Sequence, residues 1–206
     1  ILFESCSGGG GRFDPGMLYY MPQTWCSDDT DAVERLYIQY GTSMIYPPVT
    51  MGSHVSACPN HQVGRTTPFK MRGDVAMSGQ FGYELDLSKL SAEDLALAKE
   101  QVAFYKTYRS VVQQGDMYRL LSPFESSLVA WEFLKDDTAL LCTFVQKGTP
   151  ATCFKRVMMQ GMEPEAVYVR QDTGETFTGA FLMQVGILCD RRQDHISQIL
   201  VFKKQK

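Results

Sequence analysis

The chain has 206 residues, with 20 Lys and Arg residues against 23 Asp and Glu residues, so its formal net charge at pH 7 is −3. It contains no Lys/Arg-rich block, and it therefore lacks the basic surface that nucleic acids and anionic membranes select. No apolar run approaches the roughly 20 residues of a membrane span. We expect neither nucleic acid nor a membrane as a partner. The content of 44% hydrophobic and 21% charged residues is typical of a globular protein.

Six cysteines are spread along the chain, and none of them belongs to a Cys-x-x-Cys pair. A chain of this length can bury a core without disulfides, so the pattern favours thiols and a reducing compartment, although an even number also permits disulfide bonds. The first residues lack the basic and apolar segments of a signal peptide. We therefore expect a cytoplasmic protein. Because the chain opens at Ile1, within an apolar run, we also expect it to be a piece of a longer protein.

The first half of the chain predicts short strands that alternate with loops and helices. Residues 1–5 form an apolar run that predicts a strand, and four glycines at positions 8–11 follow it as a loop. Residues 51–56 predict another strand. Between them, apolar side chains recur at the spacing of a helix, at Val33, Leu36, Tyr37 and Tyr40. Gly41 is expected to end this helix.

A longer helix is predicted before residue 115. Ser91 and Asp94 have the spacing of a capping box, and Gly115 supplies a stop signal. The side chains of this helix that are expected to be buried are Leu95, Ala98, Val102, Tyr105, Tyr108 and Val112.

From about residue 120 the pattern changes to short apolar or alternating runs between Gly, Pro and Asp turns, which is typical of antiparallel strands. The expected strands are residues 129–134, 140–145, 153–159, 166–170 and 198–203, with a hairpin turn at residues 172–174. We therefore predict a chain of the α/β plus all-β class. Residues 1–119 are expected to be the C-terminal part of a (β/α)8 TIM barrel, and residues 120–206 an antiparallel β-sandwich domain.

Three carboxylates, Asp28, Asp29 and Asp31, precede the first predicted helix. An Asp at this position caps a helix by accepting backbone N–H bonds, which explains one of the three. Mutual repulsion and the neighbouring Trp25 favour a raised pKa, which a general acid requires, whereas the helix dipole acts in the opposite direction. From these residues alone, a structural role and a catalytic role both stay open.

The glycine loop leaves room for a ligand to approach the backbone, with the Cys6 thiol beside it. The loop matches neither common phosphate-binding motif, because Gly-x-x-x-x-Gly-Lys-Ser/Thr is absent and Gly-x-Gly-x-x-Gly lacks its third glycine. No His lies near Cys6 in the sequence, so little supports a role for this thiol as a nucleophile.

Two other groups of residues have ordinary structural explanations. His54, Cys58 and His61 have the spacing of metal ligands on a helix, but Pro59 is incompatible with that helix. Hydrogen-bonding histidines are therefore favoured over a zinc site. The remaining candidates are expected to lie in the core, and they are Trp131, Met158, Met159 and Met162.

Much of the chain consists of specific sequence motifs. The longest are Glu4-Ser5-Cys6-Ser7-Gly8-Gly9-Gly10-Gly11-Arg12-Phe13-Asp14-Pro15-Gly16 and Pro22-Gln23-Thr24-Trp25-Cys26-Ser27-Asp28-Asp29-Thr30-Asp31-Ala32. Shorter ones are Met51-Gly52-Ser53-His54-Val55-Ser56, Pro59-Asn60-His61-Gln62, Phe81-Gly82-Tyr83-Glu84-Leu85-Asp86 and Tyr118-Arg119-Leu120-Leu121-Ser122-Pro123-Phe124-Glu125. Taken together, these motifs closely resemble the bacterial α-galactosidases of glycoside hydrolase family 36.

The resemblance implies a retaining mechanism with two carboxylates, one a nucleophile and one an acid/base. Asp28 falls at the acid/base position. The positions that the resemblance assigns to substrate binding are Cys6, Gly8, Gly9 and Trp25. The family's nucleophile lies in a Lys-Trp-Asp motif. Neither Trp25 nor Trp131 is followed by Asp, so we expect the nucleophile upstream of this chain.

The resemblance implies an α-galactosidase, a glycosidase that hydrolyses terminal α-galactosyl residues of oligosaccharides such as melibiose and raffinose. It implies no metal and no organic cofactor, and it suggests a homo-oligomer, a tetramer. The missing nucleophile leaves open a non-catalytic fragment that acts as a sugar-binding or structural module, and the chain alone is expected to be inactive. A galactosyl-transferring enzyme of the raffinose-synthase type is the third interpretation.

Overall fold

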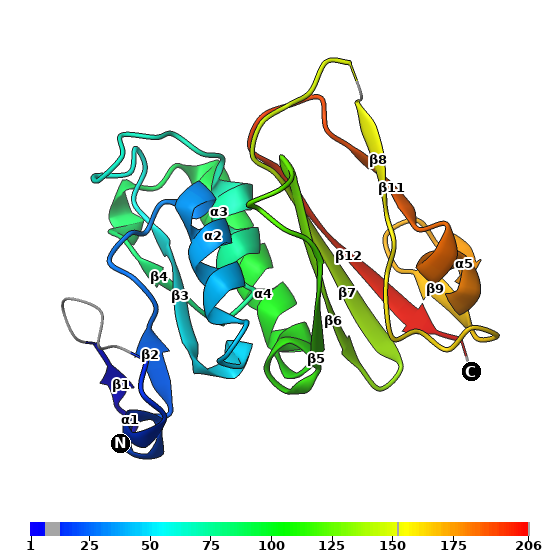
Figure 1. Ribbon diagram of the computed structural model, residues 1–206. Coiled ribbons are helices and arrows are strands. Elements are labelled where there is room, and N and C mark those ends of the chain that lie inside the picture. The colour runs from blue at the N-terminus through cyan, green and yellow to red at the C-terminus, as the bar shows by residue number, and fades with distance from the viewer. Residues whose placement is uncertain (7–12, 152, 206) are drawn as a thin grey trace. The chain divides into compact units, whose positions relative to one another are not determined.

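The structure is a computed structural model that describes residues 1–6, 13–151 and 153–205 (Figure 1). The chain forms two compact units that divide between Gln113 and Gln114. The first unit mixes helices with parallel strands, and the second consists mainly of antiparallel strands. Where the two domains meet in the sequence stays a prediction, with residue 119 as the expected end of the first.

Among the described residues, the first unit is built on a four-stranded parallel sheet with the order β1-β2-β3-β4. The strands are β1 (Glu4–Ser5), β2 (Gln23–Trp25), β3 (Met51–Ser56) and β4 (Gln80–Glu84). The helices are α1 (Pro15–Tyr20), α2 (Ala32–Thr42), α3 (Phe69–Ala76) and α4 (Ala92–Gln114), with 3-10 turns η1 (Pro48–Thr50) and η2 (Leu87–Lys89). Consecutive parallel strands that lie side by side and are joined by helices form the repeating unit of a (β/α) barrel.

The helix α2 begins where Asp31 caps it. The Asp31 carboxylate accepts the backbone N–H groups of the second and third helical residues at 2.9 and 3.1 Å. The predicted apolar face is buried at Leu36. The prediction that Gly41 ends the helix is wrong, because Gly41 belongs to the last helical turn and the helix continues to Thr42.

Alternate side chains of β3 point to opposite faces of the sheet. Val55 lies in a buried cluster with side chains of α3. On the same face, the Ser53 hydroxyl donates to Oε1 of the buried Gln39 at 2.8 Å, and the Gln39 amide donates to the Val75 carbonyl at 3.0 Å. Gln39 thereby joins α2, β3 and α3. These helices pack on one face of the sheet, which leaves His54 on the opposite face.

The helix α4 begins and ends where the sequence predicts. The Ser91 hydroxyl oxygen accepts the Asp94 N–H at 3.1 Å, and the helix stops before Gly115. Of the side chains of α4 that were predicted to be buried, Ala98 and Val112 are buried, but Leu95 is 38% exposed. The prediction that all of these side chains are buried is therefore correct only in part.

Among the described residues, the second unit contains a six-stranded antiparallel sheet with the order β10-β9-β12-β7-β6-β5 and a two-stranded sheet of β11 and β8. The elements are β5 (Asp116–Leu121), β6 (Leu128–Lys135), β7 (Thr138–Val145), β8 (Phe154–Val157), β9 (Val167–Arg170), β10 (Thr176–Thr178), α5 (Gly179–Gln184), β11 (Ile187–Asp190) and β12 (Ile196–Lys204). The long strands β6, β7 and β12 lie side by side (Figure 1). One buried apolar cluster joins the two sheets, and its members include Ala130, Leu141, Val157, Ile187 and Phe202.

The strands predicted for this part of the chain are confirmed. They include the hairpin between β9 and β10, where Gly174 has a φ of +75°, a conformation that favours glycine. Trp131, Met159 and Met162 are buried as predicted. Met158 is 54% exposed, so its assignment to the core is wrong. Both of its neighbours in the sequence are buried, and the alternation of an extended chain turns Met158 outward.

All six cysteines belong to the described residues, and none of them forms a disulfide. Among the same residues, no helix combines the length and the apolar character that crossing a bilayer requires. The longest helix, α4, carries charged side chains along its length.

A fully buried carboxyl group, that of Glu132, lies on β6. Its Oε2 accepts the Gln160 N–H at 2.9 Å, and no described residue supplies a hydrogen bond to its Oε1. Burial raises the pKa of Glu132 to about 8, while the hydrogen bond from Gln160 acts in the opposite direction. The folded protein therefore holds this side chain mainly as a neutral acid at pH 7.

We predict that Glu132 makes the free energy of unfolding fall as the pH rises. Between pH 4.5, its ordinary pKa, and about pH 8, the unfolded chain releases this proton while the folded protein keeps it. Glu132→Gln removes the titration, so the variant should be more stable than the unmodified protein by about 4 kcal/mol at the upper pH and nearly equal at the lower one. Thermal unfolding across this pH range measures the difference. The exposed Glu165→Gln is the matched control, and parallel curves for all three proteins would contradict the prediction.

Candidate active site

The carboxyl ends of the four parallel strands lie at one edge of the sheet, because parallel pairing gives all strands the same direction. Cys6 follows β1, Asp28 lies in the loop after β2, His61 lies in the loop after β3, and Glu84 ends β4. In parallel α/β folds, ligands bind at this edge. The edge is therefore the first place to expect a functional site.

Two cavities lie at this edge, and they share Trp25, Asp28 and Glu84. The larger, of about 420 Å³, is lined by Glu4, Cys6, Trp25, Asp28, His54, Tyr83 and Glu84. The smaller, of about 300 Å³, is lined by Trp25, Asp28, Thr30, Ser56, Ala57, His61 and Glu84. Asp28 is an exposed carboxylate that belongs to both. In that position it can exchange a proton with groups bound on either side.

Side chains of β2, β3 and β4 line the larger cavity. Trp25 is buried, and the His54 ring stacks on it with the ring centroids 4.6 Å apart. Gly82 pairs with His54 in the sheet, and a Cβ atom at Gly82 would lie 2.8 Å from the His54 ring. Burial lowers the pKa of His54, while the charges of Glu4 and Glu84 oppose that shift. The missing side chain at Gly82 leaves room for the His54 ring, and burial favours the neutral form of that ring.

The three aspartates of the loop after β2 have different environments. Asp31 is 2% exposed, caps α2 and forms an ion pair with Arg65. Asp29 is half-buried, its carboxylate accepts the Asp31 N–H at 3.1 Å, and its own N–H donates to the Ser27 hydroxyl at 3.1 Å. Asp28 is exposed at the two cavities. Capping explains Asp31, and Asp28 is the carboxylate that a ligand can reach.

The loop after β3 fixes this aspartate loop through Thr30. The Asn60 amide donates to the Thr30 hydroxyl at 3.1 Å, and the Thr30 N–H donates to the Gln62 side chain at 3.3 Å. The Ser56 hydroxyl donates to the Thr30 carbonyl at 3.0 Å. The N–H, the carbonyl and the hydroxyl of Thr30 are thus all bonded to one segment, which restricts the position of Asp28 two residues away.

The structure brings three of the predicted site residues together, since Asp28, Trp25 and Cys6 line the same cavity. The other two, Gly8 and Gly9, lie outside the described residues. The roles of all five in catalysis or substrate binding stay predictions.

Sequence reasoning did not single out the other acidic and aromatic side chains of the larger cavity, which are Glu4, Tyr83 and Glu84. Glu4 and Glu84 lie on strands at opposite edges of the sheet, and no spacing rule relates positions so far apart in sequence. The signal that identifies them is their place in the motifs Glu4-Ser5-Cys6 and Phe81-Gly82-Tyr83-Glu84.

The structure does not bring His54, Cys58 and His61 together as metal ligands. His54 lines the larger cavity and His61 the smaller one, while the Cys58 thiol donates to the Thr67 carbonyl at 3.7 Å. Among the residues that the structure describes, no group of three or more His, Cys, Asp or Glu side chains is arranged to hold a metal ion.

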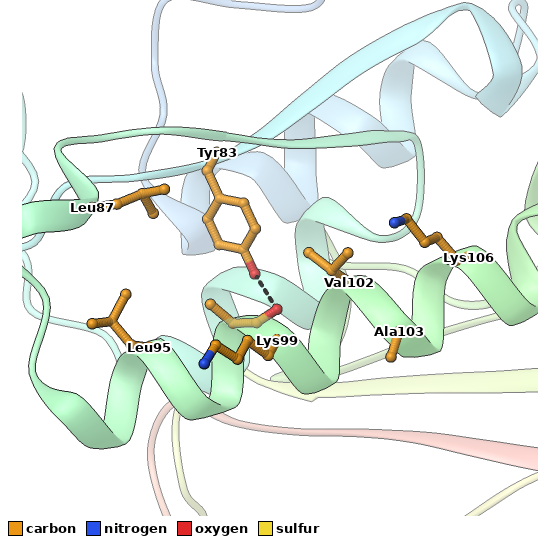
Figure 2. A pocket seen from close by; sticks show the side chains of 8 residues that line it. Tyr83, Leu87, Leu95, Lys99, Val102, Ala103 and Lys106 are labelled. Carbon is orange, nitrogen blue, oxygen red and sulfur yellow. Dashed lines mark hydrogen bonds between the residues drawn. The ribbon is translucent and has the colours of Figure 1, made fainter.

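A further pocket, of about 520 Å³, lies between β4 and α4 (Figure 2). Figure 2 shows Tyr83 pointing toward α4, where its hydroxyl donates to the Ala98 carbonyl at 3.3 Å. The eight side chains that line this pocket are mostly apolar and include two lysines but no carboxylate. It therefore offers no carboxyl group, and the carboxyl edge of the sheet remains the candidate active site.

Parallel β/α units with an exposed carboxylate at their carboxyl edge are typical of glycoside hydrolases built on a (β/α) barrel. Comparison with known proteins identifies the family. A family model described as melibiase matches residues 1–115, and the glycosyl hydrolase family 36 C-terminal domain matches residues 128–202. The chain belongs to glycoside hydrolase family 36.

Its relatives include α-galactosidases. The chain is 54% identical, over 97% of its length, to an α-galactosidase of Geobacillus stearothermophilus, of which it spans 28%. A crystal structure of a variant α-galactosidase from that organism with raffinose matches 100% of this chain and 29% of that chain, with a TM-score of 0.95 and 51% identity. The α-galactosidase of Lactobacillus brevis gives a TM-score of 0.94 and 43% identity over the same shares. These matches confirm the predicted class, (β/α)-barrel strands and helices followed by an antiparallel β-sandwich.

We predict that Asp31 stabilises the fold far more than Asp28 does. Asp31→Ala removes the cap of α2 and leaves Arg65 with Glu34 as its remaining ion pair, so the free energy of unfolding should fall by about 1 to 3 kcal/mol. Asp28→Ala removes an exposed carboxylate and should cost less than about 1 kcal/mol. Urea titration of the two variants measures both losses. Equal losses would mean that the two carboxylates do not differ in structural role.

Proposed function

We propose that the protein is a retaining α-galactosidase in which Asp28 is the acid/base. The observation that carries the proposal is the position of Asp28, an exposed carboxylate shared by two cavities at the carboxyl edge of the sheet. The substrate class is supported by structures of Geobacillus α-galactosidases in complex with raffinose and with stachyose. The chain spans 28% of the length of its curated Geobacillus relative, so the proposal concerns the activity of the whole protein.

A retaining glycosidase uses two carboxyl groups about 5 to 5.5 Å apart. In the first step, a carboxylate nucleophile attacks the anomeric carbon of the galactosyl group. The bond between that carbon and the glycosidic oxygen breaks, and the Asp28 carboxyl donates its proton to the departing oxygen. In the second step, Asp28 takes a proton from water while the water oxygen bonds to the anomeric carbon. The nucleophile departs, galactose is released, and both carboxyl groups return to their starting states.

The nucleophile is the part of this mechanism that the chain does not identify. The family resemblance assigns it to a Lys-Trp-Asp motif, which is absent from the 206 residues. We therefore assign it to a part of the protein outside them. Cys6, Gly8, Gly9 and Trp25 are assigned to the subsite for the galactosyl group, and neither step requires a metal or an organic cofactor.

A second candidate function is the binding of a galactoside without turnover. The missing Lys-Trp-Asp motif favours it for these 206 residues taken alone. In either case we propose assembly as a homo-oligomer, a tetramer, on the family resemblance. A cytoplasmic location is supported by the absence of disulfides among the six cysteines, all of which are described.

Replacing Asp28 in the full-length protein should slow substrates with poor leaving groups more than activated ones. Asp28→Ala removes the proton donor, so raffinose should lose about a hundredfold or more in kcat/KM, whereas an aryl α-galactoside with an acidic phenol needs little protonation and should lose far less. Azide should restore turnover of the aryl substrate, because it attacks the glycosyl-enzyme without help from a base. Equal losses on both substrates with no azide rescue would rule out the assignment of Asp28.

Galactose should protect Cys6 from alkylation, because this exposed cysteine lines the cavity proposed to hold the galactosyl group. With galactose at about ten times its Kd, the reaction of Cys6 with iodoacetamide should slow about tenfold. Mass spectrometry of the modified peptides measures the rate at each cysteine. Cys153, partly buried in the second unit, is the internal control and should react at an unchanged rate. Alkylation of Cys6 at the same rate with and without galactose would exclude it from the subsite.

A further inference from the structure

Arg35, on α2, is among the largest fully buried side chains of the protein. Its guanidinium carbon lies 4.4 Å from the centroid of the Trp25 ring, a cation–π contact. The Nη2 of the same group donates to the Ser27 carbonyl at 3.2 Å, while its Nε and Nη1 have no hydrogen-bond partner among the described residues. One side chain thus contacts two of the three residues that lead to Asp28.

Packing alone does not explain an arginine at this position. Taking a guanidinium out of water is costly unless a carboxylate pairs with it. The charges of Asp29 and Glu84 favour the protonated form of Arg35, but neither forms a salt bridge with it among the described residues. A methionine of similar length would fill the same space at lower cost. A costly buried charge that packing does not require is expected mainly at a functional site.

We propose that Arg35 is a positioning residue that fixes the direction in which the Asp28 carboxyl enters the two cavities. This inference rests on the proposed function, since it assigns Arg35 a part in placing the acid/base. The contacts with Trp25 and Ser27 hold the chain on the amino-terminal side of Asp28. The hydrogen bonds to Thr30 hold it on the carboxyl-terminal side. Asp28 is therefore anchored through the residues on either side of it, while its own side chain stays exposed.

The shape of the guanidinium matters for this role. Its planar group lies over the Trp25 ring, and its Nη2 donates a hydrogen bond to the Ser27 carbonyl. A lysine ammonium keeps the charge but has neither the flat surface nor the fork of donors. Arg35→Lys should therefore fold and still fail to hold the loop, whereas Arg35→Met removes the charge as well.

The test measures kcat and KM of the full-length protein and of both Arg35 variants, on raffinose and on an activated aryl α-galactoside. A misplaced acid should reduce kcat/KM for raffinose at least about tenfold more than for the aryl substrate, mainly through kcat, and azide should accelerate the aryl substrate in the variants. Arg35→Lys keeps the test decisive if Arg35→Met does not fold.

Arg72→Met is the matched control. Arg72 on α3 is a partly buried arginine whose guanidinium lies 4.9 Å from the Phe69 ring and whose Nη1 donates to the Ser56 carbonyl at 2.7 Å, so it resembles Arg35 without contacting residues 25–27. Its loss should affect both substrates by the same factor. Equal losses on both substrates in the Arg35 variants, or the same selectivity in Arg72→Met, would overturn the inference and leave the proposed function standing. An unmodified protein that cleaves neither substrate would overturn both.

Discussion

Parallel pairing of the strands β1 to β4 is the constraint on which the site depends. The register places Trp25 opposite Gly52, His54 opposite Gly82 and Ser56 opposite Glu84, so paired side chains share one face of the sheet. In two of these pairs one partner is glycine, which leaves room for the ring of the other partner. A Cβ atom at Gly52, for example, would lie 3.2 Å from the Trp25 ring. The stacked rings exist because each has a neighbour without a side chain.

Several buried polar groups of the first unit have hydrogen-bond partners, which limits the cost of burying them, whereas Thr24 Oγ1, Asp31 Oδ2 and both Nε and Nη1 of Arg35 have none among the described residues. A buried donor or acceptor without a partner costs about 1 to 3 kcal/mol, whereas a satisfied one contributes slightly to stability. The Asp31 carboxylate accepts a backbone N–H group at the start of α2, and each polar group of Thr30 has a hydrogen-bond partner. Glu132 in the second unit has a partner for one of its two oxygens. The protein accommodates that side chain by keeping it protonated. A pH titration of stability detects this protonation, whereas the list of its contacts does not.

Sequence patterns that span a few residues predicted much of the fold. Contacts between segments far apart in the sequence could not be predicted. The cap and the apolar periodicity identified α2 and α4, and alternation identified β3 and most strands of the second unit. The helix α3 escaped prediction because the charged residues Lys70 and Arg72 alternate with its buried ones, and β4 escaped because Gly82 interrupts its pattern.

The same division applies to the site. Asp28, Trp25 and Cys6 were identified from motifs, and they line one cavity. The stacking of His54 on Trp25 joins two strands, and the contact of Arg35 with Trp25 joins a helix to a strand. Their positions in the sequence carry no spacing that would pair them, so these contacts required the folded structure.

The buried amide of Gln39 determines how the first unit moves. It accepts from β3 and donates to α3 while it lies on α2, so none of these three elements can separate from the others without breaking a buried hydrogen bond. They are expected to open and close as a single cooperative body, with similar protection of their amides against hydrogen exchange. The loop that carries Asp28 leads directly into α2, which is part of this body. A molecule that enters the cavities therefore meets a rigid wall, and the flexibility that admits it has to come from elsewhere in the protein.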